Sequence, residues 1–443
     1  MRWVALGVAL AAIPGTAQIG GSTATGWDPP VLVTQTQAHR ETSIALSPTD
    51  PNVMAVCDPS GVPNTAGNQS YFHRSLDGGQ TWSYMDVEGG QTDTRNYAFE
   101  GGDCDVAFDA AGTMYSADTW LGSLSVGHSS DGGKTWDGTA VAGTSPVVDR
   151  PWLYGGKAGE LYVSYQDLQC CLASAIWFTK STDYGKTFLP AVPVTTANHE
   201  GAFTWEGNYA VSPDGQHIYL IYTRRQGPAV GSLDSMGPEK VMLASSHDGG
   251  LTWTNSLIAA MPNPASYLYP SIAMDEGGNL HAVFSSKRAS DRPIYYTFSS
   301  NRGLTWRAPE PVTTGVSGYA PWIAGGKAGE AAIVWLGSPD PKMTETASFP
   351  WYFYWSRVTD SDTGTPTFTS GTTTETPIFT GAQTMPEFEM VKLDKEGRMH
   401  IGMSVFKRVS NANRWVIYYQ RESAPPAEEP TPPADEPPPP PAP

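Results

Sequence analysis

The sequence predicts an all-β protein, a β-propeller of four-stranded antiparallel blades, from three observations. An eight-residue turn motif recurs along the chain, and a unit of two apolar strands recurs upstream of it. Successive units are about 50 to 65 residues apart, a spacing that accommodates four short strands and is typical of one blade.

The turn motif first occurs as SLDGGQTW, from Ser75 to Trp82. Its Asp is suited to accept hydrogen bonds from nearby backbone N–H groups, its glycines favour positive φ, and its last aromatic residue returns to the core. Each copy is therefore expected to form a tight turn between two strands. The later copies are SSDGGKTW, STDYGKTF, SHDGGLTW and SSNRGLTW, which begin at Ser129, Ser181, Ser246 and Ser299.

The second unit consists of an apolar strand, a turn with Gly, Asp or Asn, and another apolar strand. Seven copies of this hairpin predict seven blades. They are Thr42 to Val56, Asp105 to Ala117, Trp152 to Tyr165, Tyr209 to Tyr222, Ser271 to Phe284, Trp322 to Trp335 and Glu389 to Met403.

The two ends of the propeller are expected to meet and close the ring. The seventh unit has no turn motif and ends with the strand Arg414 to Glu422, so its outer strand is missing. Pro29 to Thr36 resembles the outer strands Ala191 to Thr196 and Glu310 to Gly315. We therefore expect the N-terminal strand to complete the last blade, which removes exposed sheet edges.

Composition divides the chain into three parts. Residues 1–17 combine Arg2 with an apolar run and small residues at their end, which predicts a signal peptide and a secreted, cell-surface or periplasmic protein. Residues 27–422 hold the propeller. Residues 423–443 are rich in Pro and have no core to bury, so we expect a disordered spacer.

The net charge of −17 argues against a nucleic-acid partner, because phosphate binding requires a basic face. No segment after the signal peptide is apolar enough to span a membrane. We expect a monomer that binds a glycan or glycoconjugate.

Four cysteines allow three disulfide pairings. Cys57 and Cys104 lie at strand ends that share one face of a propeller, so a bridge between them is expected in an exported protein. Cys170 and Cys171 would then form a vicinal disulfide. Free or cross-paired thiols are the alternative.

Charged residues are expected to converge at the mouth of the central channel where the innermost strands begin. Buried charges must be paired, so this ring is either a functional site or a network of ion pairs that fastens the blades. The residues before these strands are Arg40, Glu41, Asp103, Asp105, Asp149, Arg150, Glu206, Tyr269, Tyr319, Glu387 and Glu389. The loops after the second strands add Asp58, Asp167, Arg224, Arg225, Lys287, Arg288, Arg292, Lys407 and Arg408.

The turn pattern SxDxGxTW resembles the Asp box, or BNR repeat, of the sialidase superfamily. This resemblance implies that each box joins the third and fourth strands of a blade on the face away from the active site. It also implies the alternative of a six-bladed ring, as in sialidases. Three further segments are similar to catalytic segments of exo-sialidases, namely Trp205 to Arg225, Phe284 to Trp306 and Val316 to Ile323.

The sialidase resemblance implies a role for each matching residue. Tyr319 takes the place of the nucleophile and Glu206 that of the base that activates it. A clamp of arginines would hold a sugar carboxylate through paired hydrogen bonds. Its candidates are Arg40, Arg150, Arg224, Arg225 and Arg292, and the candidates for the acid are Asp58 and, as a fallback, Asp103. The family's first-blade motif is absent, and Glu41 stands where the first clamp Arg is expected.

Three functions follow from these observations. The first is a retaining exo-sialidase-like glycoside hydrolase with the Tyr319 and Glu206 pair. The second is a non-catalytic propeller that binds a glycan or protein at the same mouth. The third is a polysaccharide lyase or a hydrolase of other sugar specificity, in which the acidic ring supplies acid and base. No cofactor is expected, and the scattered histidines show no spacing typical of a metal site.

Overall fold

The computed structural model describes fourteen segments of the chain, and within them all named elements are β-strands. None of the described residues forms a helix that is long and apolar enough to cross a membrane. The signal peptide, Cys170, Cys171 and nearly all of the Pro-rich tail lie outside the described residues. These are 23–38, 41–59, 70–87, 102–120, 123–141, 148–167, 175–195, 202–226, 240–260, 269–286, 292–341, 348–381, 388–409 and 412–424.

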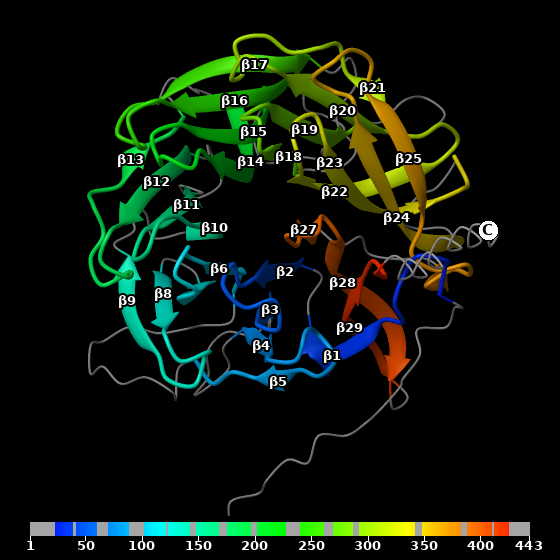
Figure 1. Ribbon diagram of the computed structural model, residues 1–443, viewed down its shortest axis with the longest axis horizontal. Helices are drawn as coiled ribbons and strands as arrows, with labels where there is room; N and C mark the ends of the chain where they lie inside the picture. Colours follow the sequence, from blue (N-terminus) through cyan, green and yellow to red (C-terminus); the bar gives the residue numbers. More distant parts are fainter. Residues whose placement is uncertain are drawn as a thin grey trace, which may run out of the picture.

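The strands form a propeller, with sheets arranged around a central axis and their inner strands nearest that axis (Figure 1). Five sheets follow the chain order from the inner strand outward. They are β6 (Cys104–Phe108), β7 (Met114–Trp120), β8 (Ser123–Ser129) and β9 (Asp137–Val141); β10 (Val148–Gly155), β11 (Leu161–Asp167), β12 (Ala175–Ser181) and β13 (Val192–Pro193); β14 (Ala202–Val211), β15 (Ile218–Gln226), β16 (Lys240–Ser246) and β17 (Thr254–Ala260); β18 (Ser271–Met274), β19 (Leu280–Ser285), β20 (Ile294–Ser299) and β21 (Glu310–Pro311); and β22 (Ser317–Gly325), β23 (Ala331–Ser338), β24 (Phe349–Thr359) and β25 (Thr367–Thr372), with β26 (Phe379–Gly381) beside β24.

The remaining sheet has eight strands in the order β1-β29-β28-β27-β2-β3-β4-β5. Its inner strands β2 and β27 meet through a short parallel ladder of two residue pairs, and the sheet divides there into two four-stranded halves. If each half is counted as one blade, the propeller has the seven blades that the sequence predicts. This count stays a prediction. The strands are β1 (Val31–Ala38), β2 (Glu41–Leu46), β3 (Met54–Asp58), β4 (Tyr71–Ser75), β5 (Ser83–Tyr84), β27 (Phe388–Leu393), β28 (Met399–Val409) and β29 (Ala412–Arg421).

The N-terminal strand closes the ring, as the sequence predicts. Strand β1 pairs antiparallel with β29 as the outer strand of the last unit, and Val31 lies opposite Tyr419. Trp27 forms a further bridge with Glu422. The two ends of the propeller therefore stabilise one sheet together.

The five turn motifs join the third and fourth strands of their sheets, which confirms the prediction for them. In the first motif, Ser75 Oγ donates to Asp77 Oδ1 at 2.8 Å, and the backbone N–H of Thr81 donates to the same oxygen at 2.9 Å. Gly79 has a φ of 87°, and a Cβ there would lie 2.1 Å from the ring of Tyr419. Glycine is therefore required both by the turn and by the packing against the neighbouring half-sheet.

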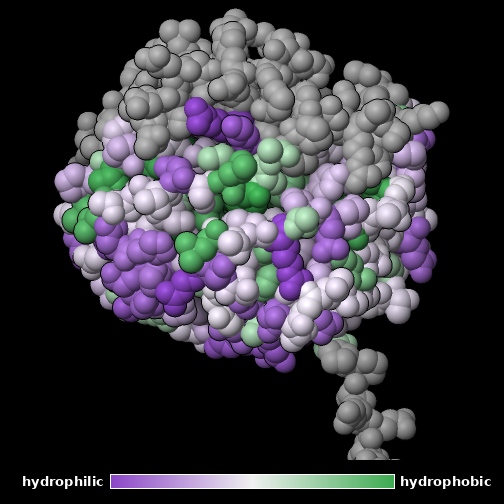
Figure 2. Space-filling view, turned by 90° about the horizontal axis from the view of Figure 1, so that it is seen from above, coloured by the Kyte–Doolittle hydropathy of each residue, from purple (hydrophilic) through white to green (hydrophobic). Residues whose placement is uncertain are grey.

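The core lies between neighbouring sheets, because each sheet packs on both faces. Strand β11 is buried at every position, which explains why its first three residues are all apolar or aromatic, while Ser164 and Gln166 are polar residues within it. Outer strands such as β17 alternate more, and Leu257 there is exposed. Seen from its edge, the molecule carries hydrophobic residues among hydrophilic ones (Figure 2).

Cys57 of β3 and Cys104 of β6 form a disulfide that joins two neighbouring sheets, with 6.3 Å between their Cα atoms.

Candidate active site

Three inner strands are irregular at the positions where candidate site residues begin them. The pairing register shifts between Asp149 and Trp152 in β10, between Glu206 and Tyr209 in β14, and between Tyr319 and Trp322 in β22. A β-bulge of this kind bends the strand and redirects the side chains next to it. Each bulge therefore lies directly after a residue that the sequence places at the mouth.

Two residues within these bulges have left-handed backbone conformations. Arg150 has a φ of 53° and Ala320 a φ of 50°. Such angles are unfavourable for residues with a Cβ and occur where the surrounding structure enforces them. The backbone is thus held in an unusual shape at both places.

Arg150 is the centre of a buried cluster of charges. Its Nε lies 3.3 Å from Asp103 Oδ2, and its Nη1 lies 3.4 Å from Glu41 Oε2. Its backbone N–H donates to Asp103 Oδ2 at 3.2 Å and to Asp149 Oδ1 at 3.1 Å. The guanidinium group therefore pairs with two carboxylates, and the backbone of the same residue binds a third.

Aromatic side chains cover this cluster. The guanidinium carbon of Arg150 lies 4.6 Å from the ring centroid of Tyr269, within the range of a cation–π interaction. The ring of Tyr269 meets that of Trp205 edge to face, with 6.0 Å between centroids. Aromatic rings beside paired charges are suited to pack against the apolar face of a sugar ring.

Asp103 and Glu206 have pKa values shifted in opposite directions. Burial raises the pKa of Asp103, but the charge of Arg150 and hydrogen bonds with Asp149 and Glu41 outweigh burial and lower it to about 2. Burial raises the pKa of Glu206 well above its ordinary value, and the negative charge of Asp149 adds to this rise. At neutral pH Asp103 is therefore ionised, whereas the environment of Glu206 favours its protonated form.

Strand β14 holds Glu206 against the neighbouring sheet. Its backbone N–H donates to Gln166 Oε1 at 3.4 Å, and the Ser164 hydroxyl offsets part of the rise in its pKa. Among the described residues, no donor forms a well-aligned hydrogen bond with either of its carboxyl oxygens. Sequence analysis missed Ser164 and Gln166. The signal for them is the presence of polar residues in the otherwise apolar strand β11.

Tyr319 lies in a different set of contacts. It is fully buried in β22, with the guanidinium carbon of Arg292 4.9 Å from its ring centroid and the ring of Trp351 6.2 Å away. The structure thus brings Arg292 and Tyr319 together. The groups that act on the pKa of Glu206 come from β10 and β11 instead.

The other predicted arginines have different placements. Arg224 is half-buried in β15 opposite Thr204, on the same face of the sheet as Glu206, and its Nε is buried without a hydrogen-bond partner among the described residues. Arg225 lies in the same strand, but the structure does not describe its side chain. Arg40 lies outside the described residues.

Asp58 is fully buried at the end of β3, where its role is to fix the start of β2. Its Oδ1 accepts a hydrogen bond from the backbone N–H of Glu41 and another from Thr42 Oγ1, both at 3.3 Å. Glu389 lies close by, and burial raises its pKa well above the ordinary value. Asp58 therefore holds the backbone of Glu41 in place through a hydrogen bond.

Two tryptophans close the centre of the molecule. Trp152 of β10 and Trp322 of β22 have ring centroids 5.2 Å apart. Both line a cavity of about 400 Å³ that also contacts Asp105 and Lys392. Asp105 accepts hydrogen bonds from Ser43 and from backbone N–H groups, and burial raises its pKa to about 6. Asp105, which the sequence places at the mouth, therefore lines this cavity together with the two tryptophans.

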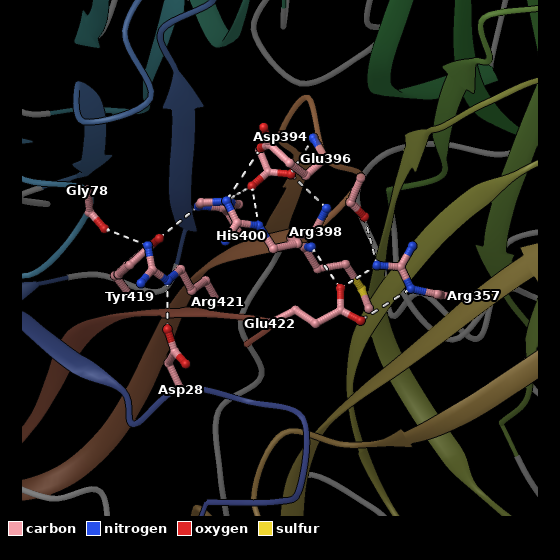
Figure 3. Close-up of polar contacts among 12 residues, drawn as sticks. Asp28, Gly78, Arg357, Asp394, Glu396, Arg398, His400, Tyr419, Arg421 and Glu422 are labelled. Atoms are coloured by element: carbon pink, nitrogen blue, oxygen red, sulfur yellow. Dashed lines mark hydrogen bonds and ion pairs between the residues drawn. The ribbon is translucent and has the colours of Figure 1, made fainter. Parts of the chain in front are cut away.

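A second cleft, of about 1050 Å³, lies at the turn-motif end of the molecule. Several of the charged residues at this cleft form ion pairs (Figure 3). Arg421 Nε donates to Asp28 Oδ2 and Arg398 Nε to Asp394 Oδ2, both at 2.7 Å, and Arg357 pairs with Glu422. These pairs tie the chain ends to the last two units of the ring.

No group of three or more His, Cys, Asp or Glu side chains arranged to hold a metal ion is found within the described segments.

Known proteins share this architecture. The model of the BNR repeat-like domain family matches residues 17–282. No curated protein matches the chain. A solved ulvan lyase of polysaccharide lyase family PL25 has a TM-score of 0.50 and 12% identity, over 90% of this chain and 95% of the lyase. At that identity the likeness concerns the fold alone.

Two further solved structures have lower scores. The α-L-arabinofuranosidase of Fusarium graminearum in complex with arabinobiose has a TM-score of 0.49 and 14% identity, over 89% of this chain and 98% of the enzyme. A leech intramolecular trans-sialidase has a TM-score of 0.46 and 12% identity, over 90% of this chain and 70% of the enzyme.

Proposed function

This chain belongs to the BNR repeat-like domain family, and we propose that it is a carbohydrate-active enzyme whose mouth uses two carboxyl groups as acid and base. The observation that carries the proposal is the opposite shift of two carboxyl pKa values: that of Asp103, which pairs with Arg150, is lowered, and that of Glu206, on which Asp149 acts, is raised. Environments that push the pKa values of neighbouring groups apart assign one as acid and the other as base.

Glu206 is the proton donor in this proposal. Burial and the charge of Asp149 both raise the pKa of its carboxyl group and so favour the protonated form that an acid requires. It donates its proton to the glycosidic oxygen as the bond to the leaving sugar breaks.

Asp103 supplies the negative charge. Arg150 keeps its carboxylate ionised, and the carboxylate stabilises the positive charge that develops on the sugar or activates a water molecule. The half-buried ring of Trp205 packs against the sugar ring, and the buried ring of Tyr269 supports Trp205. This assignment gives Glu206 the opposite role to that of the base implied by the sialidase resemblance.

A sialidase-type reaction is the second candidate, because Arg292 lies against the ring of Tyr319. A positive charge there favours the ionised phenol that a Tyr nucleophile requires. In this case Tyr319 would attack the sugar, and Arg224 and Arg292 would bind its carboxylate.

The test is a substrate panel with three forms of the purified protein. Wild type, Glu206→Gln and Tyr319→Phe are incubated with chromogenic α-L-arabinofuranoside, α-sialoside and β-glucuronide and with ulvan. Released chromophore reports hydrolysis, and absorbance of an unsaturated product reports elimination. The proposal expects turnover of at least one substrate, about 10² to 10⁴-fold slower in Glu206→Gln and little changed in Tyr319→Phe.

Cleavage of the sialoside by the wild type and its loss in Tyr319→Phe would instead establish the second candidate. Saturable binding of a glycan without turnover of any substrate would assign the mouth to a binding protein and contradict both enzyme proposals.

A further inference from the structure

Two histidines that are thirty residues apart in sequence meet at the end of a strand pair. In β15 and β16, Ile218 lies opposite Ser246 and Tyr219 opposite Ser245. His217 and His247 are the next pair in this register. Residues directly opposite each other point to the same face, and the two Nδ1 atoms are 2.9 Å apart.

A neighbouring arginine fixes the ring proton of His217. Arg302 Nη1 lies 3.3 Å from His217 Nε2, and a guanidinium group can only donate hydrogen bonds. His217 Nε2 is therefore the acceptor, and its proton is on Nδ1, from which it donates to His247 Nδ1. Both imidazoles are neutral in this arrangement, which is the form that binds metal ions.

A buried hydroxyl lies beside the pair. Tyr219 is two residues after His217 in an extended segment, so its side chain is on the same face. Its ring is 6.1 Å from that of His247, and its hydroxyl oxygen is buried without a hydrogen-bond partner among the described residues. The charges of Arg302 and Asp214 both act on the pKa of Tyr219, so these groups lie near its hydroxyl. A buried hydroxyl is costly unless something hydrogen-bonds to it.

We propose that His217 and His247 bind one divalent transition-metal ion through their Nδ1 atoms, with water completing the coordination and a hydrogen bond from that water to Tyr219. Imidazole nitrogen suits zinc, nickel and copper ions. Metal–nitrogen bonds of about 2.0–2.1 Å in tetrahedral geometry need about 3.3 Å between the two nitrogens. The two nitrogens have to move apart by a few tenths of an ångström, and each ring has to turn by about 35° so that its Nδ1 points at the ion; the side chain of His247 is exposed and can make this movement.

Arg302 competes with the metal in this site. The ion takes the lone pair of His217 Nδ1, so the ring proton moves from Nδ1 to Nε2. Nε2 then carries a proton and no longer accepts a hydrogen bond from Arg302. The positive charge of Arg302 also repels the ion, so both effects weaken metal binding in the wild type.

Isothermal titration of the full, untagged chain with Zn²⁺, and separately with Ni²⁺, tests the site. We expect one saturable equivalent in the wild type and a Kd at least roughly tenfold higher in His217→Ala and in His247→Ala. Arg302→Ala should bind more tightly. His128→Ala is the matched control, because His128 lies in β8 beside Asp137, and its Kd should equal that of the wild type.

Thermal unfolding provides a second readout. Saturating Zn²⁺ should raise the Tm of the wild type but not of the two histidine variants, and His247→Gln keeps the test valid if His247→Ala folds poorly. The proposal is overturned by an unchanged Kd in both histidine variants, by equal or weaker binding in Arg302→Ala, or by no saturable binding up to about 1 mM. None of these variants is expected to lose carbohydrate turnover. A failure of the metal-site proposal is therefore distinguishable from a failure of the proposed enzyme function.

Discussion

The indole rings of Trp152 and Trp322 meet with 5.2 Å between their centroids, although their strands β10 and β22 lie on different sides of the ring (Figure 1). Each tryptophan follows the bulge of its strand, and both are almost fully buried. The contact therefore supports the backbone that carries Arg150 on one side and Tyr319 on the other.

Trp322→Ala should lower the free energy of unfolding by about 3–5 kcal/mol, because it removes a buried indole and leaves a cavity next to Trp152. Urea unfolding followed by far-UV circular dichroism measures this change. Leu304→Ala is the control, since Leu304 is 81% exposed and its replacement should have little effect. Equal stability of the two variants would show that the contact does not support the core.

Arg150→Met should destabilise the protein by about 3–5 kcal/mol, because it leaves the buried carboxylates of Asp103 and Glu41 without their cation. The double variant Arg150→Met with Asp103→Asn should recover part of this loss. Unfolding at pH 7 measures these two variants and Asp103→Asn alone, and Lys134→Met on the exposed surface is the control. A double variant whose loss equals the sum of the single losses would contradict the coupling.

Glu206→Gln should make stability less dependent on pH. The folded pKa of Glu206 is raised above its unfolded value near 4.5, so this group stabilises the folded state below that pH, and the contribution is lost as pH rises toward the folded pKa. The free energy of unfolding of the wild type should therefore fall relative to that of Glu206→Gln above about pH 4.5.

Urea unfolding at several pH values checks this difference. Glu396→Gln is the matched control, because the side chain of Glu396 is 64% exposed and should give no such trend. A parallel pH dependence in wild type and Glu206→Gln would mean that Glu206 is ionised in the folded protein.

Replacing Cys57 and Cys104 together by Ala should cost roughly 2–4 kcal/mol, because their disulfide closes a loop between residues 47 apart and so restricts the unfolded chain. Chemical unfolding without reductant compares this variant with the wild type. A variant as stable as the wild type would show that the bond adds no net stability.

The strands and turns could be predicted from the sequence because each depends on the chemistry of residues close together in the chain. The turn at Ser75 is set by hydrogen bonds within a few residues, and closure by β1 follows from the missing outer strand of the last unit. The gathering of charges at Glu41, Asp103 and Arg150 also followed from the position of each residue before an inner strand.

The geometry and protonation of the site residues could not be predicted from the sequence. The bulges at Glu206 and Tyr319 and the left-handed backbone of Arg150 depend on packing between sheets, and the protonation of Glu206 depends on its burial there. The pair His217 and His247 has no sequence spacing that marks a metal site, because strand register alone brings the two together.

The most direct test of the central claim is the pH dependence of kcat/KM for the best substrate of the panel, measured for wild type and Glu206→Gln. The account predicts that wild-type activity falls at high pH as Glu206 loses its proton, and that Glu206→Gln lacks this limb and is slower throughout. A Glu206→Gln variant with wild-type activity and the same alkaline limb would contradict the assignment of Glu206 as the acid.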